Sequence, residues 1–227
     1  MKRIAFTLCL LCAASFNTLH AQPSLIDPVP PASNQANGAP KVTLPLIDPA
    51  TEIKGRALVE ALRKGGFNLY MRHALQIPPH TAVCDGPSLQ QQGIEQTNTV
   101  ATAIRQLKIP VSRVLTSEPC RNQETARRLG LGTPEVSAGL NPLGTIPGFD
   151  YAGARSNLFA ELPVAGTNVI MVSHLHGSAN KAEWMHLELA EVIVYQPDGK
   201  GSSKPVARIR VEQWAELIKV VGESGPR

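Results

Sequence analysis

The chain has 227 residues and a formal net charge of +4, with 43% hydrophobic and only 4% aromatic residues. So small a charge, dispersed along the sequence, argues against the dense basic surface that nucleic-acid binding requires, and the scarcity of aromatic residues argues against stacking on bases or sugars. The length allows one domain with a single sizeable core once terminal segments are set aside.

The first 21 residues have the pattern of a secretory signal peptide. Lys2 and Arg3 form a positive start, residues 4–16 form an apolar run too short to span a bilayer, and Leu19-His20-Ala21 resembles a cleavage site. Cleavage would lower the net charge from +4 to +2, because Lys2 and Arg3 would be removed. We therefore expect a periplasmic or secreted protein that begins near Gln22 and has no membrane span.

Residues 22–50 predict an extended or flexible segment, because they contain seven prolines and almost no periodic apolar pattern. The motif Leu-Ile-Asp-Pro occurs twice in this segment, at 25–28 and 46–49. In the second copy, Asp48 suits the N-cap of a helix and Pro49 its first position. We expect residues 51–227 to form the one folded domain.

Helical and strand patterns alternate through this domain. Strands are expected at about 67–71, 113–117, 135–138, 168–173, 191–196 and 206–211. Helices are expected at about 49–64, from Ser88 to Pro110, and at 121–129, 153–161 and 212–221. This alternation predicts an α/β fold, a three-layer sandwich with a mostly parallel central sheet and helices on both faces. The Gly- and Pro-rich stretch 139–153 is either a lid over a site or an ordinary surface loop.

Three of the expected strands are followed by cationic or imidazole side chains. The strand at 67–71 precedes Arg72 and His73, Arg121 follows the strand ending near 117, and His174 follows the strand ending at 173. Open α/β sheets present reacting side chains at the ends of their strands. Two arginines and two histidines around one point favour a phosphate, since a planar guanidinium binds its oxygens bidentately.

These blocks resemble, in the same order, the histidine phosphatase superfamily of phosphoglycerate mutase and the acid phosphatases, in its small secreted bacterial branch. The blocks are the R-H pair at 72–73, S-x-x-x-R-x-x-x-T-A at 117–126, the S-H pair at 173–174 and the strand-turn at 192–201. The resemblance covers about residues 62–214 and implies a phosphoglycerate mutase-like fold. It also implies that His73 is a nucleophile forming a phosphohistidine, that Arg72 and Arg121 clamp the phosphate, and that His174 is a further donor. No cofactor and no metal are implied.

The resemblance further implies a carboxylic acid that protonates the leaving oxygen, and here the chain departs from the family. Leu175 stands where some members have an aspartate, and 135–142 has no clear counterpart of the mutase glutamate. Glu191 and Glu188 are our candidates, because Glu191 would lie near the mouth of the site if its strand ran antiparallel to 168–173. A solvated helix end is the alternative for both.

Two cysteines, Cys84 and Cys120, remain once Cys9 and Cys12 leave with the signal peptide. An even pair in an exported protein suggests a disulfide, which would join the loop after His73 to the turn carrying the second arginine. Two unpaired buried thiols are the alternative. Two cysteines at this spacing lack the ligand pattern of a metal site.

Together these features predict an exported, metal-independent phosphoric monoester hydrolase with a phosphohistidine intermediate. Resemblance to lipopolysaccharide core heptose phosphatases suggests a cell-envelope phosphate ester as substrate, beside small-molecule esters. The segment 86–89 lacks the arginine that related secreted members carry, which leaves substrate preference open. The alternatives are a catalytically weak module of the same fold that binds a phosphorylated ligand, and a phosphomutase. Neither the natural substrate nor the oligomeric state follows from the sequence.

Overall fold

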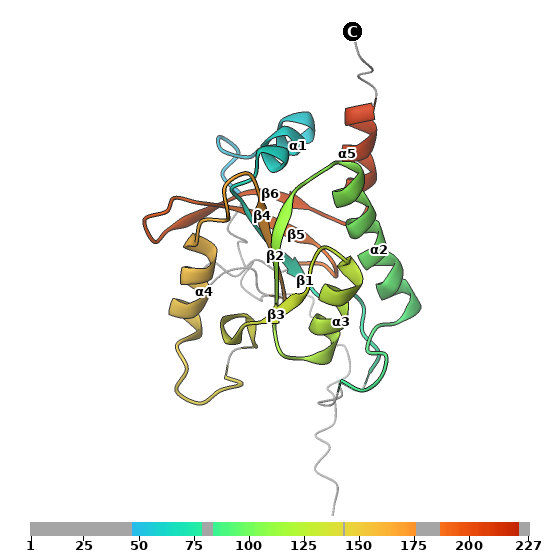
Figure 1. The fold of residues 1–227 in the computed structure, drawn as a ribbon, viewed down its shortest axis with the longest axis vertical. Helices are drawn as coiled ribbons and strands as arrows, with labels where there is room; N and C mark the ends of the chain where they lie inside the picture. Colours follow the sequence, from blue (N-terminus) through green and yellow to red (C-terminus); the bar gives the residue numbers. More distant parts are fainter. Residues whose placement is uncertain (1–46, 79–83, 143, 176–186, 223–227) are drawn as a thin grey trace, which may run out of the picture. The chain divides into compact units, whose positions relative to one another are not determined.

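The computed structural model describes residues 47–78, 84–142, 144–175 and 187–222. The expected signal peptide and most of the proline-rich segment lie outside these ranges, so both remain predictions. The described residues belong to one compact unit (Figure 1).

The centre of this unit is a six-stranded mixed sheet in the order β3-β2-β4-β1-β5-β6. The strands are β1 (Asn68–Arg72), β2 (Val111–Thr116), β3 (Pro134–Val136), β4 (Asn168–Ser173), β5 (Val192–Pro197) and β6 (Ser203–Ile209). β1 to β4 are mutually parallel, while β5 is antiparallel to both β1 and β6. The expected mostly parallel sheet is therefore confirmed, with an antiparallel hairpin added beside β1.

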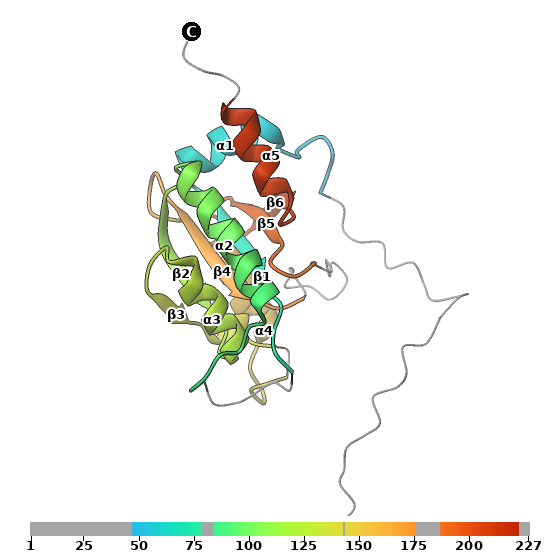
Figure 2. The ribbon, with the colours of Figure 1, turned by 90° about the vertical axis from the view of Figure 1, so that its right-hand side faces the viewer.

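Helices cover both faces of this sheet and complete the three expected layers. They are α1 (Gly55–Lys64), α2 (Gln91–Gln106), α3 (Cys120–Leu129), the 3-10 turn η1 (Ala138–Leu140), α4 (Tyr151–Ala160) and α5 (Gln213–Gly222). One core cluster joins α1, α2, α3 and α5 to one face, and a second joins η1 and α4 to the other. Figure 2 shows α2, α3 and α5 in front of the sheet and α4 behind it.

The central strands explain why the two clusters separate so cleanly. In β1, Leu69 and Met71 belong to the first cluster, whereas Tyr70 belongs to the second. This follows from the two-residue repeat of a strand, whose successive side chains point to opposite faces. Every residue of β4 is buried, as is typical of a parallel strand with helices on both sides.

The start of the first helix differs from the prediction. α1 begins at Gly55, whereas the backbone N–H of Ile53 donates to the oxygen of Val206 and holds this segment extended beside β6. The Asp48 carboxylate accepts the N–H of Ala50 at 2.9 Å and so closes a local turn instead of capping α1. The end of the helix is as predicted, because Gly65 adopts a φ of 79° that stops it.

The second helix also starts later than Ser88, at Gln91. The Glu124 carboxylate accepts hydrogen bonds from the N–H and hydroxyl of Ser88, and Leu89 pairs with Gln76 in an isolated antiparallel bridge. These contacts keep residues 88–89 extended, so the helix begins only after them.

Candidate active site

The sheet brings the three sequence blocks to one edge. β1, β4 and β2 are neighbouring parallel strands, and the register sets Arg72 opposite Ser173 and Thr116 opposite Val172. The residues that follow these strands therefore emerge together, as expected for the carboxyl edge of an open α/β sheet. The imidazole ring centroids of His73 and His174 are 5.9 Å apart.

His73 is held by its backbone and by one ring nitrogen. It is 5% exposed, and its N–H donates to the oxygen of Ser173 at 2.9 Å. Its Nδ1 lies 2.9 Å from the oxygen of Ala74. A carbonyl oxygen can only accept, so Nδ1 carries the proton in this contact and the neutral ring keeps its lone pair on Nε2. This is the tautomer that a nucleophile at Nε2 requires.

His174 contacts Ser117, which follows β2, and Arg121 on α3. Its Nε2 lies 3.0 Å from the hydroxyl of Ser117, and its Nδ1 lies 3.3 Å from Nη2 of Arg121. A guanidinium only donates, so Nδ1 is the acceptor and Nε2 carries the hydrogen. Burial, and then the positive charge of Arg121, lower the pKa of His174 from 6.5 to about 2. The imidazole is therefore neutral in the protein without a bound anion.

Arg72 and Arg121 are two cations for which the described part of the chain provides no ion-pair partner. Neither forms an ion pair within the described ranges, and the Nε of each is buried without a hydrogen-bond partner there. Burial lowers the pKa of both guanidinium groups, and the charge of Arg72 lowers that of Arg121 further. Buried donors without partners and neighbouring like charges are both costly, and a bound oxyanion relieves both.

The side chains of Thr125 and Asn122 connect α3 to the ends of β1 and β4. The Thr125 hydroxyl donates to the oxygen of Arg121 at 2.7 Å and accepts the N–H of Ala74 at 3.2 Å. The Asn122 amide donates to the oxygen of Ser173 at 2.6 Å. These contacts fix the position of Arg121 relative to the residues that follow β1 and β4.

Sequence reasoning missed two residues beneath the site. Arg155 on α4 is 3% exposed and donates to the oxygens of Gly139 and Asn141, which orders the chain around η1. The Tyr70 hydroxyl accepts the N–H of His174 and lies 3.3 Å from its oxygen. No motif marks Arg155, whereas Tyr70 stands two residues before Arg72 and reads as an ordinary core residue.

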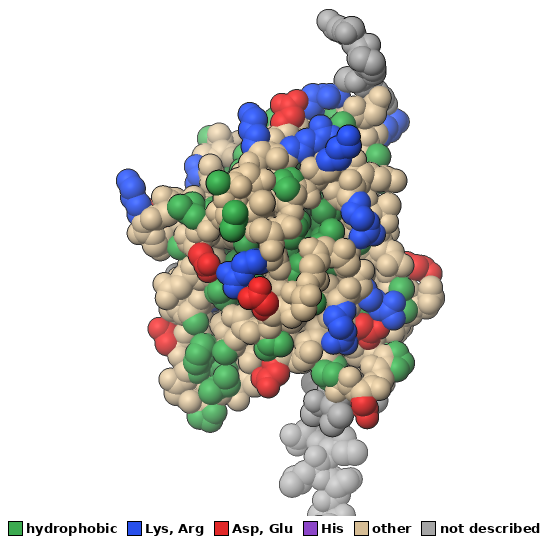
Figure 3. Space-filling view, in the orientation of Figure 1, with side chains coloured by type: hydrophobic (Ala, Val, Ile, Leu, Met, Phe, Trp, Pro, Cys, Tyr) green, Lys and Arg blue, Asp and Glu red, His purple; other side chains and the backbone are tan. Residues whose placement is uncertain are grey.

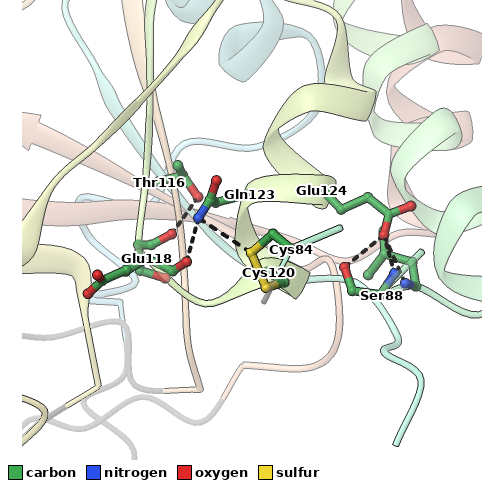
Figure 4. Close-up of a disulfide and its surroundings, with 9 residues drawn as sticks. Cys84, Ser88, Thr116, Glu118, Cys120, Gln123 and Glu124 are labelled. Carbon is green, nitrogen blue, oxygen red and sulfur yellow. Dashed lines mark hydrogen bonds between the residues drawn. A yellow bond between two sulfur atoms is a disulfide. The ribbon is translucent and has the colours of Figure 1, made fainter. Parts of the chain in front are cut away.

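Figure 4 shows the disulfide that joins Cys84 to Cys120, with an S–S distance of 2.02 Å. Cys120 opens α3 and directly precedes Arg121. Beside the bridge, Glu124 accepts from Ser88, so the loop after β1 is attached to α3 at two points. The bridge and this hydrogen-bonded contact hold the loop against the helix that carries the second arginine.

The backbone of Glu191 lies where we expected it, beside the end of β1, but its carboxylate is engaged in other contacts. β5 runs antiparallel to β1 and therefore to β4, as the prediction required, and within the described residues no helix ends at either glutamate. Glu191 is fully buried, and its carboxylate accepts hydrogen bonds from Arg208 and from the N–H of Glu188. The Glu188 side chain is 63% exposed and lies 3.6 Å from Arg210. The general-acid assignment therefore stays a prediction without geometric support.

The described part of the chain shows neither a metal-binding cluster nor a membrane-spanning helix. Within it, no three or more His, Cys, Asp or Glu side chains are grouped so as to hold a metal ion. None of its helices combines the length and apolar character needed to cross a bilayer. On the face seen in Figure 3, Lys and Arg side chains are scattered among acidic and uncharged ones.

No protein-family model and no curated protein sequence matches the chain. Its fold is similar to that of the protein histidine phosphatase SixA complexed with tungstate, with a TM-score of 0.50, 17% identity, and coverage of 65% of this chain and 98% of that one. An Entamoeba histolytica phosphoserine phosphatase in complex with 3-phosphoglyceric acid matches with a TM-score of 0.43 and 14% identity, over 63% of this chain and 95% of that one. A mycobacterial glucosyl-3-phosphoglycerate phosphatase matches with a TM-score of 0.41 and 17% identity, over 57% and 89%.

Proposed function

We propose that this chain, which has the phosphoglycerate mutase-like fold of the histidine phosphatases, hydrolyses a phosphate monoester through a phosphohistidine at His73. One observation carries the proposal. Arg72 and Arg121 bring two positive charges and two unpartnered buried Nε–H groups, within the described residues, to the strand edge where two imidazoles lie 5.9 Å apart. A phosphate supplies the missing negative charge and the missing acceptors at once.

The proposed reaction has two steps. Nε2 of His73 attacks phosphorus and forms an N–P bond while the bond from phosphorus to the leaving oxygen breaks. Arg72 and Arg121 stabilise the charge on the other phosphoryl oxygens, which is the main task of a protein in phosphoryl transfer. Water then cleaves the N–P bond, releasing phosphate and restoring His73. An alkoxide leaving group also needs a proton, whose donor we do not assign.

Compartment and substrate are part of the proposal. The signal-peptide pattern of residues 1–21 supports export to the periplasm or beyond, and a disulfide suits an oxidising compartment. A small-molecule or cell-envelope phosphate ester then becomes the substrate class. The same anion site would also serve a module that binds a phosphorylated ligand without turnover, so catalysis has to be measured directly.

The test uses the purified mature protein with p-nitrophenyl phosphate in the presence of EDTA. We expect turnover in the wild type, none in His73→Ala, and an acid-labile phosphoprotein in quenched wild-type reactions that His73→Ala does not form. Arg127→Ala is the matched surface control, because Arg127 is exposed on the same helix as Arg121. Phosphate binding without turnover on any ester would favour the binding module. Full activity in a folded His73→Ala protein would exclude the phosphohistidine.

A further inference from the structure

We propose that Glu191, together with Arg208, is a positioning residue that sets the orientation of the Arg72 guanidinium. The inference rests on the proposed function, because it assigns to Arg72 the phosphate as its ligand. It replaces the general-acid role with a different one, in which Glu191 never contacts the substrate.

The side chains of Glu191 and Arg72 are linked through the peptide group between Leu187 and Glu188. The N–H of Glu188 donates to Oε2 of Glu191 at 2.6 Å. The carbonyl of the same peptide unit, that of Leu187, accepts from Nη1 of Arg72 at 2.7 Å. A carboxylate that accepts from the N–H side of a peptide polarises it and makes its oxygen a better acceptor. Glu191 therefore both fixes and strengthens the hydrogen bond that orients Arg72.

The backbone of Glu191 holds Arg72 as well. The N–H of Arg72 donates to the oxygen of Glu191 at 3.0 Å, where β5 begins beside the end of β1. A tight turn brings the side chain back toward this point, since the N–H of Glu191 lies 3.2 Å from the oxygen of Glu188 and Ala190 adopts a φ of 58°. Positive φ is unfavourable for alanine and is tolerated mainly where the surrounding structure demands it.

Arg208 holds the Glu191 carboxylate in place through both of its oxygens. Its Nε and Nη2 donate to the two oxygens of Glu191, the second at 2.8 Å, from the neighbouring strand β6. The Nε of Arg210 also lies 3.7 Å from Oε1 of Glu191, so the carboxylate has two cations on one side and Arg72 on the other. Of these three arginines, Arg72 is the one whose Nε is buried without a hydrogen-bond partner within the described residues. Burial lowers the pKa of Arg72, and the Glu191 charge raises it, so the carboxylate favours the charged clamp.

A buried ion pair is weak evidence for stability alone, because desolvating both charges offsets much of their attraction. The Glu191–Arg208 pair has a directional consequence that an apolar pair of the same volume would lack. It holds one peptide with its carbonyl aimed at the guanidinium of Arg72.

The experiment compares Glu191→Gln with the wild type on p-nitrophenyl phosphate and on an alkyl phosphate, and measures binding of inorganic phosphate by calorimetry. Glutamine keeps the volume but removes the charge that orients the peptide. We expect KM and the phosphate Kd to rise by about 10- to 100-fold, since small displacements of a positioned group have effects of this size. The factor should be the same for both esters. Glu135→Gln is the matched control, an exposed glutamate paired with Arg113 at the far edge of the sheet, and should change neither value.

A loss in Glu191→Gln confined to the alkyl phosphate would overturn the inference and restore the general-acid role. Unchanged KM and Kd in a folded variant would overturn it as well. If Glu191→Gln fails to fold by circular dichroism, Arg208→Met, which removes both hydrogen bonds from Arg208 to the carboxylate, decides in its place by the same criteria. If the wild type hydrolyses no ester, the proposed function fails, while the effect on phosphate Kd still decides the positioning role.

Discussion

Removing the Cys84–Cys120 bridge should lower the free energy of unfolding by a predictable amount. The two cysteines are 36 residues apart, so the bridge restricts a loop of that size in the unfolded chain. In the chain-entropy model such a loop corresponds to about 4 kcal/mol at 25 °C. For a domain of this size the loss converts to a fall in Tm of about 8–16 °C.

The assay is urea unfolding of the wild type and of the double variant Cys84→Ala/Cys120→Ala, each with and without a reducing agent. Reduction should bring the wild type to the stability of the double variant and leave the double variant unchanged. Because Cys120 directly precedes Arg121, phosphate affinity should fall as well. An unfolding free energy within about 1 kcal/mol of the oxidised wild type would refute the loop-closure argument.

Three further outcomes follow from the site and its supports. Arg121→Ala should lower kcat on p-nitrophenyl phosphate by about 10²- to 10³-fold, as loss of one charge-stabilising donor does, while Arg127→Ala keeps wild-type rates. The lowered pKa of His174 means that the unfolded chain binds a proton that the folded protein rejects between pH 6.5 and about 2. Stability should therefore fall by up to about 1.4 kcal/mol per pH unit below pH 6.5, and His174→Gln should flatten that slope in urea titrations. Glu124→Gln should cost about 1–3 kcal/mol, measured by thermal unfolding, because Ser88 loses a carboxylate acceptor.

The sequence was sufficient to predict that Arg72, His73, Arg121 and His174 meet. Each follows a short apolar run that the alternation of helical and strand patterns marks as a buried strand, and parallel strands present their carboxyl ends at one edge. No knowledge of loop conformation was required for this step.

The residues that hold the site residues in position could not be predicted in the same way. The role of Glu191 depends on a turn at Ala190 with positive φ, which alanine does not signal, and on an arginine seventeen residues further along the chain. Arg155 donates to the carbonyl groups of Gly139 and Asn141, in and just after η1, and no sequence motif marks this contact. The start of α1 was misplaced because a tertiary contact between Ile53 and Val206 outweighs the helix signal of Asp48 and Pro49.

Because β1 lies between β4 and β5, the site can form only at a late stage of the protein's synthesis. Already at the start of β1, the N–H of Phe67 donates to the side chain of Asn168, 101 residues further on. Pairings at such long range form slowly, because a large loop must close before any contact rewards it. A growing chain that ends before β4 contains Arg72, His73 and Arg121 but neither the strand that aligns them nor His174. The anion site therefore arises only after most of the domain has been made, and a chain terminated before β4 cannot form it.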